Sequence, residues 1–231
     1  MGSTVVAAAR GTTRGRRGLL WVAALVVIAV GVLGGVLYQG SQQSAAVAGA
    51  DFPAVVAEDG TVVAGSANAR ASIDVYEDFL CPYCRKDLEQ RYGDQLTKAL
   101  AAGQLRVTYH LLNLLDRESN PAGYSLRAAN AALAAAKAGR FAAFHALLYR
   151  EQPGEGQGGY TEDQLIDMGR RVGLTGDQFA AEVHGGTYAA KIRSVTDRAR
   201  DATFFKGTPT VVMSTVPVDI ADPNWLARLT R

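Results

Sequence analysis

Two cysteines, the only ones among 231 residues, stand in the motif Cys-Pro-Tyr-Cys at residues 81–84. An apolar, β-branched and aromatic run at residues 73–76 precedes the motif, and good helix formers follow it at residues 85–90. This order predicts a strand, a tight turn and a helix that opens at the cysteines. Because all the cysteine of the chain is placed in this one motif, we interpret it as a site of thiol chemistry.

The predicted helix places Cys81 at its N-terminus. Unpaired backbone N–H groups and the positive end of the helix dipole favour a thiolate there, so we expect a lowered pKa for Cys81. A thiolate both attacks and leaves in disulfide exchange, and this environment therefore speeds exchange at Cys81. Cys84 lies one turn further and is expected to be the deeper, resolving thiol. Pro82 suits a first helical position because its missing N–H has no partner to lose there.

Two structural roles compete with this interpretation. A disulfide that only staples the chain gains little here, because cross-link stabilisation grows with loop length and this loop is very short. Half of a zinc site is the other alternative, since a structural zinc ion needs four ligands. The remaining candidates are three histidines that are scattered singly, and we interpret each as a core or surface residue: His110, His145 and His184. We therefore predict no metal site.

The N-terminal region predicts a membrane anchor. Residues 1–17 carry four arginines and no acidic residue, and residues 18–38 are uncharged and largely apolar. That stretch is long enough to span a bilayer as a helix, and the arginines place residues 1–17 in the cytoplasm. The catalytic part is then extracytoplasmic at the cell membrane. An oxidising exterior also allows a dithiol to remain a disulfide.

A cleavable signal peptide is the competing reading of this region. Small residues at 45–50 could supply a cleavage site, but the apolar run exceeds the roughly 7 to 15 residues usual in a signal peptide, so we favour an uncleaved anchor. Residues 39–51 are rich in Gln, Ser, Ala and Gly and are expected to form a flexible tether. Four of the 24 basic residues lie in the tail, so the rest of the chain carries 20 basic and 22 acidic residues. This near-neutral balance does not indicate nucleic-acid binding.

Residues 52–231 are expected to form one domain. A strand at 105–111 follows the motif helix, which ends near residue 102, and completes a β-α-β unit with parallel strands. The next expected elements are alanine-rich helices at residues 122–138, 140–150, 161–172, 175–183 and 187–202. Thr161 and Gln164 indicate a capping box at one of them. A strand at 210–213, another at 216–220 and a helix at 223–229 complete the domain.

Two motifs mark this order of elements: Cys-Pro-Tyr-Cys at residues 81–84 and Gly-Thr-Pro-Thr-Val-Val at residues 207–212. Together with the order of elements, they resemble the DsbA-like branch of the thioredoxin superfamily, in particular its membrane-anchored actinobacterial members. The resemblance implies an α/β thioredoxin fold with a helical insertion at about residues 113–202, preceded by one transmembrane helix. It implies that Cys81 is the nucleophile and Cys84 the resolving cysteine, and that Pro82 and Tyr83 tune their reactivity. The alternative for Tyr83 is a residue that only packs on the surface, and the alternative for Pro209 is an ordinary trans proline at the start of a strand.

The resemblance further implies a cis-proline at Pro209 that faces the disulfide. The backbone of Thr208 then turns outward and can pair with an extended substrate strand. The implied function is an oxidoreductase without a cofactor that donates a disulfide to reduced exported proteins. A membrane quinone-linked partner of the DsbB or vitamin-K-epoxide-reductase type would reoxidise it. A reductase or isomerase of the same fold, or a redox-inert chaperone or binding module, remains the alternative.

The chain departs from the family pattern at two places. Family members often carry a buried carboxylate six residues before the first cysteine, where this chain has Val75. Glu77, Asp78 or water could move the proton instead, although carboxylates near a strand end more often face solvent. The turn at Ser214 and Thr215 also lacks the usual Asn-Gly type of hairpin signal, which leaves the register of the last strands open.

Overall fold

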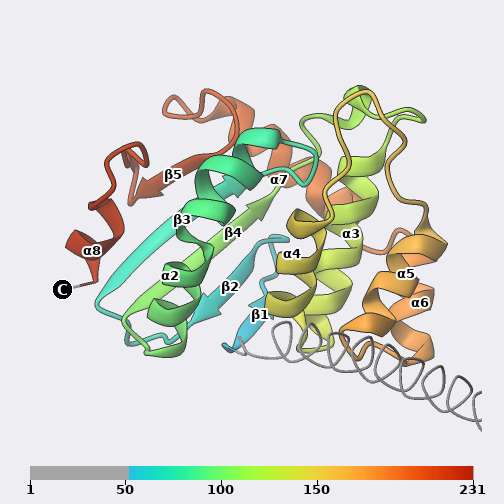
Figure 1. Ribbon diagram of the computed structural model, residues 1–231, viewed down its shortest axis with the longest axis horizontal. Coiled ribbons are helices and arrows are strands. Elements are labelled where there is room, and N and C mark those ends of the chain that lie inside the picture. The colour runs from blue at the N-terminus through green and yellow to red at the C-terminus, as the bar shows by residue number, and fades with distance from the viewer. Residues whose placement is uncertain (1–51, 231) are drawn as a thin grey trace, which may run out of the picture. The chain divides into compact units, whose positions relative to one another are not determined.

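The computed structural model describes residues 52–230. Six strands form one mixed sheet in the order β1-β2-β4-β3-β5-β6 (Figure 1). Their bounds are β1 Ala54–Val56, β2 Val62–Gly65, β3 Ala71–Glu77, β4 Leu105–Leu111, β5 Thr210–Met213 and β6 Val216–Pro217. β3 and β4 are parallel, and the other neighbouring pairs are antiparallel. The centre of the sheet is therefore the predicted β-α-β unit.

The β-α-β unit is built from residues whose types match their positions. Val75 of β3 lies opposite Tyr109 of β4, and alternate residues of β4 are buried, as a strand with one face on the core requires. The connecting helix begins at Pro82, directly after Cys81; its π-helical stretch, η1 (Cys84–Glu89), follows Tyr83 and continues as α2 (Gln90–Ala101). The helix was predicted, but its π-helical opening was not.

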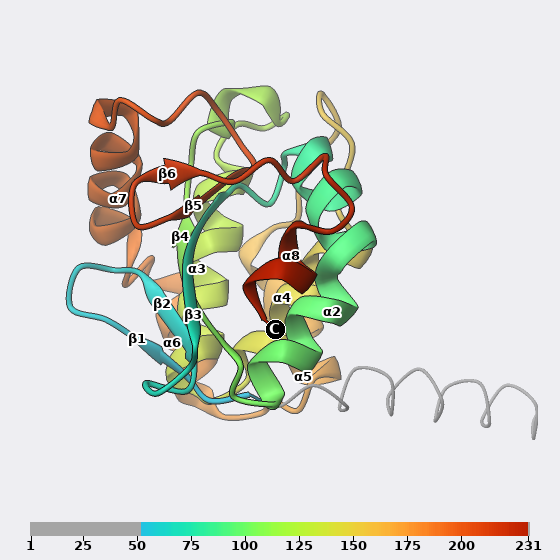
Figure 2. The same ribbon diagram turned by 90° about the vertical axis from the view of Figure 1, so that its left-hand side faces the viewer.

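Different helices cover the two faces of the sheet. Helices α2 and α8 (Trp225–Leu229) lie on one face, where Ile73 and Val75 join the main core (Figure 2). Helix α7 (Ala189–Asp201) lies on the opposite face, where Tyr76 packs in a smaller cluster. This alternation along β3 follows from the two-residue period of a strand.

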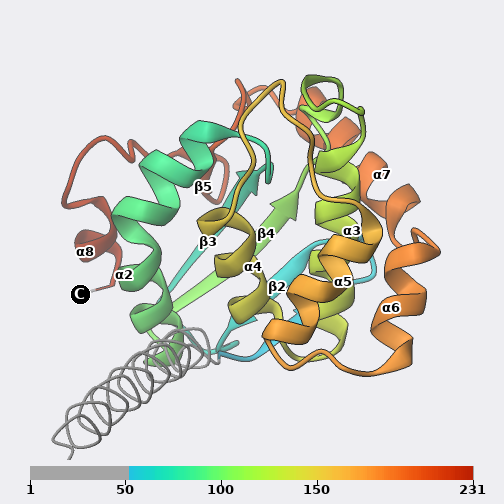
Figure 3. The same cartoon turned by 45° about the vertical axis from the view of Figure 1, so that its right-hand side comes forward.

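A helical insertion separates β4 from β5. It contains η2 Asp116–Glu118, α3 Tyr124–Lys137, α4 Phe141–Arg150, α5 Glu162–Arg171, α6 Asp177–His184 and α7. Figure 3 shows α3, α4, α5 and α6 as one block beside the sheet. The alanines of α3 are buried and small, so neighbouring helices can approach it closely. The predicted helices are confirmed within about two residues at each end, and the capping box of Thr161 and Gln164 is present.

The last two strands form a hairpin whose register the structure defines. Met213 pairs with Val216, so Ser214 and Thr215 form a two-residue turn, with Ser214 at a φ of 60°. The peptide bond between Thr208 and Pro209, just before β5, is cis, as the resemblance implied. Strands β1 and β2 were not predicted.

The expected tail, membrane helix and tether at residues 1–51 lie outside the described residues. From residue 52 to residue 230, every helix is too short or too polar to cross a membrane.

Gly65 at the end of β2 gives a test of the sheet. Its φ is +89°, and an added Cβ would lie 2.4 Å from the carbonyl oxygen of Leu105. We expect Gly65→Ala to lower the free energy of unfolding by about 2 kcal/mol or more, because both the conformation and the contact are unfavourable.

Denaturant unfolding of the purified protein measures this loss. Gly176→Ala is the matched control, because an added Cβ there meets no atom within 4 Å and its φ is −79°. Equal stability of the two variants would contradict the close approach of β2 and β4.

Candidate active site

Cys81 lies between the turn that follows β3 and the connecting helix, and Cys84 is the first residue of η1. The two thiols are not joined, and both residues are buried, with 3% and 0% of their surfaces exposed. Pro82 and Tyr83 between them are exposed, so the motif shows its middle to solvent and its sulfurs to the interior. The backbone at the strand end and at the helix start therefore sets the positions of both sulfur atoms.

Thr208 meets Cys81 although 127 residues separate them in the sequence. The thiol of Cys81 donates a hydrogen bond to the carbonyl oxygen of Thr208 at 3.1 Å, next to the cis bond to Pro209. The backbone N–H of Cys84 donates to the sulfur of Cys81 at 3.4 Å. The structure therefore brings four of the predicted site residues together: Cys81, Cys84, Thr208 and Pro209.

The two thiols differ in acidity. The side chain of Cys84, then that of Thr208 and the backbone N–H groups of Cys84 and Tyr83, lower the pKa of Cys81 to about 7, although burial opposes this shift. The pKa of Cys84 is raised well above its usual range, first by burial and then by Cys81 and by the charge of Glu77. Near neutral pH the site thus holds a partly ionised outer sulfur and a protonated inner one.

A surface pocket of about 400 Å³ is lined in part by Thr208, the residue that accepts the hydrogen bond from Cys81. It is lined by Tyr83, Asp87, Arg91, Thr208, Pro209 and Ile220, among others. Tyr83, with 61% of its surface exposed, forms part of this wall and does not pack into the core. An extended peptide beside Cys81 would meet these side chains.

Glu77 and Asp78 are fully buried, so the expectation that carboxylates near this strand end face solvent was wrong. Asp78 is enclosed by donors: Leu80 N–H at 2.8 Å, Ser125 Oγ–H at 2.6 Å and Leu115 N–H at 2.9 Å. Burial raises the pKa of Asp78 to about 6, although these hydrogen bonds oppose the shift. Asp78 thereby ties the turn before Cys81 to the insertion.

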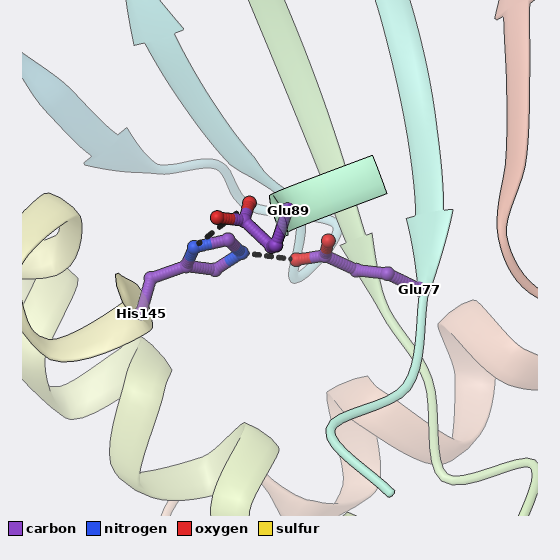
Figure 4. Close-up of side chains that lie close together, drawn as sticks. All are labelled: Glu77, Glu89 and His145. Atoms are coloured by element: carbon purple, nitrogen blue, oxygen red, sulfur yellow. Dashed lines mark hydrogen bonds and ion pairs between the residues drawn. The ribbon is translucent and has the colours of Figure 1, made fainter. Parts of the chain in front are cut away.

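Glu77 contacts His145, which comes from α4 of the insertion (Figure 4). The ring atom Nε2 of His145 lies 2.6 Å from Oε1 of Glu77, and Nδ1 lies 3.6 Å from Oε1 of Glu89. Burial alone would lower the pKa of His145, but the two carboxylates raise it to about 9. The interpretation of His145 as an ordinary core residue missed this charge cluster.

Two more side chains, one on the same face of α4 and one just beyond the end of this helix, form hydrogen bonds with the backbone of the motif turn. Tyr149 donates from its hydroxyl to the carbonyl oxygen of Asp78 at 3.4 Å. The amide of Gln152 donates to the carbonyl oxygens of Phe79 at 3.0 Å and Cys81 at 2.9 Å. Positions 145, 149 and 152 follow the helical spacing i, i+4, i+7, which is the signal that could have identified them. The other two histidines pair elsewhere: His110 with Asp74 and His184 with Asp163.

The pKa of Cys81 can be tested through its partner. Cys84→Ala removes the side-chain hydrogen bond that contributes most to the lowered pKa, so we expect the pKa of Cys81 to rise from about 7 toward its usual value. Cys84→Ser keeps a donor at the same place and should retain a lower pKa than Cys84→Ala.

The pH dependence of alkylation by iodoacetamide measures both values. Identical titration curves for the alanine and serine variants would show that the Cys84 side chain does not stabilise the thiolate.

Comparison with known proteins places this site in a family. A family model described as thioredoxin matches residues 57–225. MdbA from Corynebacterium diphtheriae, a thiol-disulfide oxidoreductase, is 26% identical, with a TM-score of 0.67 over 78% of this chain and 94% of that one. Reduced DsbA from Mycobacterium tuberculosis is 27% identical, with a TM-score of 0.62 over 78% and 90% of the two chains.

The curated relatives include a much longer protein. The serine/threonine-protein kinase PknE of Mycobacterium tuberculosis is 31% identical over 182 residues, which are 75% of this chain and 32% of PknE. The chain thus spans about a third of the length of that relative. The match of the family model to most of the chain, and the likeness to the two oxidoreductases, show that the chain belongs to the thioredoxin family and is a DsbA-like protein thiol-disulfide oxidoreductase.

Proposed function

We propose that this oxidoreductase works as an oxidase outside the cytoplasm and donates the Cys81–Cys84 disulfide to newly exported proteins. The observation that carries the proposal is the unequal acidity of the two thiols, with a lowered pKa at Cys81 and a raised one at Cys84. A stabilised Cys81 thiolate favours the reduced form of the pair, and this favours transfer of the disulfide to a substrate.

In the proposed reaction a substrate thiolate attacks Sγ of Cys81. The Cys81–Cys84 bond breaks, and Cys84 leaves with the electron pair and takes up a proton. A second substrate thiolate then attacks the substrate sulfur of the mixed disulfide, and Cys81 leaves as a thiolate. The substrate gains one disulfide and the enzyme gains two electrons. Cys81 suits the leaving role because thiols of low pKa leave faster.

The backbone of Thr208 is the proposed docking point for the substrate. In the reduced protein its carbonyl oxygen accepts the hydrogen of the Cys81 thiol. In the mixed disulfide that hydrogen is gone, so the carbonyl can accept a backbone N–H of an extended substrate segment instead. We propose that the segment lies in the pocket beside Pro209, where Tyr83 and Arg91 offer an aromatic and a charged wall. Pro82 and Tyr83 are proposed to tune the redox pair.

The location and the redox partner are also proposals. An uncharged apolar stretch at residues 18–38, preceded by arginines, supports a single-pass anchor with a cytoplasmic N-terminus. A protein anchored in this way is well placed for reoxidation by a membrane quinone-linked partner of the DsbB or vitamin-K-epoxide-reductase type. A reductase or isomerase would use the same atoms in the opposite direction, so the reduction potential separates the two functions.

Equilibration of the full chain with graded ratios of reduced and oxidised glutathione tests the direction. We expect a reduction potential closer to about −120 mV, typical of a disulfide donor, than to about −270 mV, typical of thioredoxin. A value near that of thioredoxin would contradict the oxidase and indicate a reductant.

Transfer to a substrate is the second measurement. The oxidised full chain should introduce disulfides into a reduced, unfolded substrate protein, and Cys81→Ser should abolish the transfer. A Cys81→Ser variant with undiminished activity would overturn the assignment of Cys81 as nucleophile. Chaperone activity that survives Cys81→Ala with Cys84→Ala would favour a redox-inert binding role.

A further inference from the structure

One face of the motif helix carries two charged side chains that have no partner of opposite charge. Tyr83, Asp87 and Arg91 follow one another at every fourth residue, and all three line the pocket beside Pro209. Residues at this spacing lie on nearly the same side of a helix. Neither Asp87 nor Arg91 forms a side-chain hydrogen bond or an ion pair within residues 52–230. The pocket therefore offers one unpaired carboxylate and one unpaired guanidinium group to an entering chain.

Another part of the pocket wall is fixed to this helix by Tyr92. The hydroxyl of Tyr92 donates to the carbonyl oxygen of Ile220 at 2.9 Å, and Ile220 lines the pocket. The guanidinium carbon of Arg91 lies 5.4 Å from the centre of the Tyr92 ring, within the range of a cation–π contact. One buried tyrosine thus positions both the apolar wall and the cation before a ligand binds, which lowers the entropy cost of binding.

An extended peptide matches the spacing of the two charges. Four residues of a helix advance by about 6 Å along its axis. Two residues of a strand advance by about 6.6 Å, and alternate side chains point to the same side. A substrate segment that lies along the helix therefore presents alternate side chains, first to Asp87 and then to Arg91. These two residues lie about 9 Å and about 15 Å along the helix from Cys81, or about three and five substrate residues away.

We propose that Asp87 and Arg91 select substrate segments by the order of their charges. The favoured segment has a basic residue about three positions from its reacting cysteine and an acidic residue about five positions from it. The basic side chain pairs with Asp87 and the acidic one with Arg91, whereas the reverse order places like charges together. Asp87 and Arg91 are then specificity-determining residues, and the inference rests on the docking at Thr208 proposed above.

Each charge also has a purely structural explanation. Asp87 lies in the first turn of η1, where an acidic side chain is stabilised by the helix dipole. Arg91 is exposed, and a solvated arginine needs no further partner. Both explanations predict that the pocket makes no distinction between substrates of equal net charge.

The experiment is a competition of two peptides for Cys81 in the full chain with Cys84→Ala, which retains a mixed disulfide because it lacks the resolving thiol. The peptides have one cysteine each and identical composition. One has lysine three residues and glutamate five residues from the cysteine, and the other has these two exchanged. The protein is first joined to one peptide by exchange with the disulfide-linked dimer of that peptide.

The thiolate of the second peptide then attacks the mixed disulfide and releases the first peptide as a thiol, so the reaction needs no oxidant or reductant. At equilibrium the ratio of the two mixed disulfides, separated by chromatography, measures the difference in docking. One pair of peptides carries the charges after the cysteine, and a second pair carries them before it.

We expect an excess of about five-fold for the peptide with lysine nearer the cysteine, in one of the two pairs, as partly exposed ion pairs allow. Asp87→Arg combined with Arg91→Asp should invert this ratio, and high salt should bring it close to one. Asp94→Lys combined with Lys98→Asp is the matched control and should leave the ratio unchanged. These two residues are exposed, have the same spacing on the same helix and lie outside the pocket lining.

Equal amounts of the two mixed disulfides in both pairs would overturn the proposal. A preference that survives the exchange of Asp87 and Arg91 would overturn it as well. If the exchanged variant does not fold, Arg91→Gln decides alone: it removes one of the two attractions, and an unchanged ratio would contradict the selection. The peptides compete for the same sulfur whichever way electrons flow in the cell, so this result is independent of the reduction potential that tests the oxidase.

Discussion

The burial of polar groups between Glu77 and Cys81 is the constraint on which the rest of the structure depends. Two carboxylates and several carbonyls lie there without access to solvent, and each would cost free energy if it had no partner. The insertion supplies those partners through Ser125, His145, Tyr149 and Gln152. The helical insertion is therefore part of the active-site architecture, and the contacts that shape the motif turn also fix α4 against the sheet.

The same constraint explains how two identical side chains acquire different chemistry. Cys81 and Cys84 are separated by less than one turn of helix, yet one sulfur meets donors and the other is enclosed beside a carboxylate. The difference in pKa arises from the surroundings of each sulfur: Thr208 lowers the pKa of Cys81, and the charge of Glu77 raises the pKa of Cys84. Disulfide exchange needs one sulfur that leaves readily and one that holds its proton, and this environment provides both.

The sequence allowed prediction of the elements that have a clear period. Strands β3 and β4 and the helices of the insertion carry repeated apolar positions, and the family resemblance implied that the loop at Pro209 would face the cysteines. Strands β1 and β2 were missed because three and four residues are too few to show a period. The burial of Glu77 could not be predicted, because it depends on His145, 68 residues away. The membrane helix at residues 18–38 stays a prediction.

The long sequence separation of the site has a consequence for the order in which the protein is made. A chain synthesised from its N-terminus presents Cys81 and Cys84 well before His145, Gln152 and Thr208 exist. Until those residues have been added and folded, the two cysteines are ordinary thiols of similar acidity. The unequal pair is therefore acquired late, once nearly the whole domain has emerged. A nascent enzyme is thereby a substrate-like dithiol first and an exchange catalyst only after its own folding is complete.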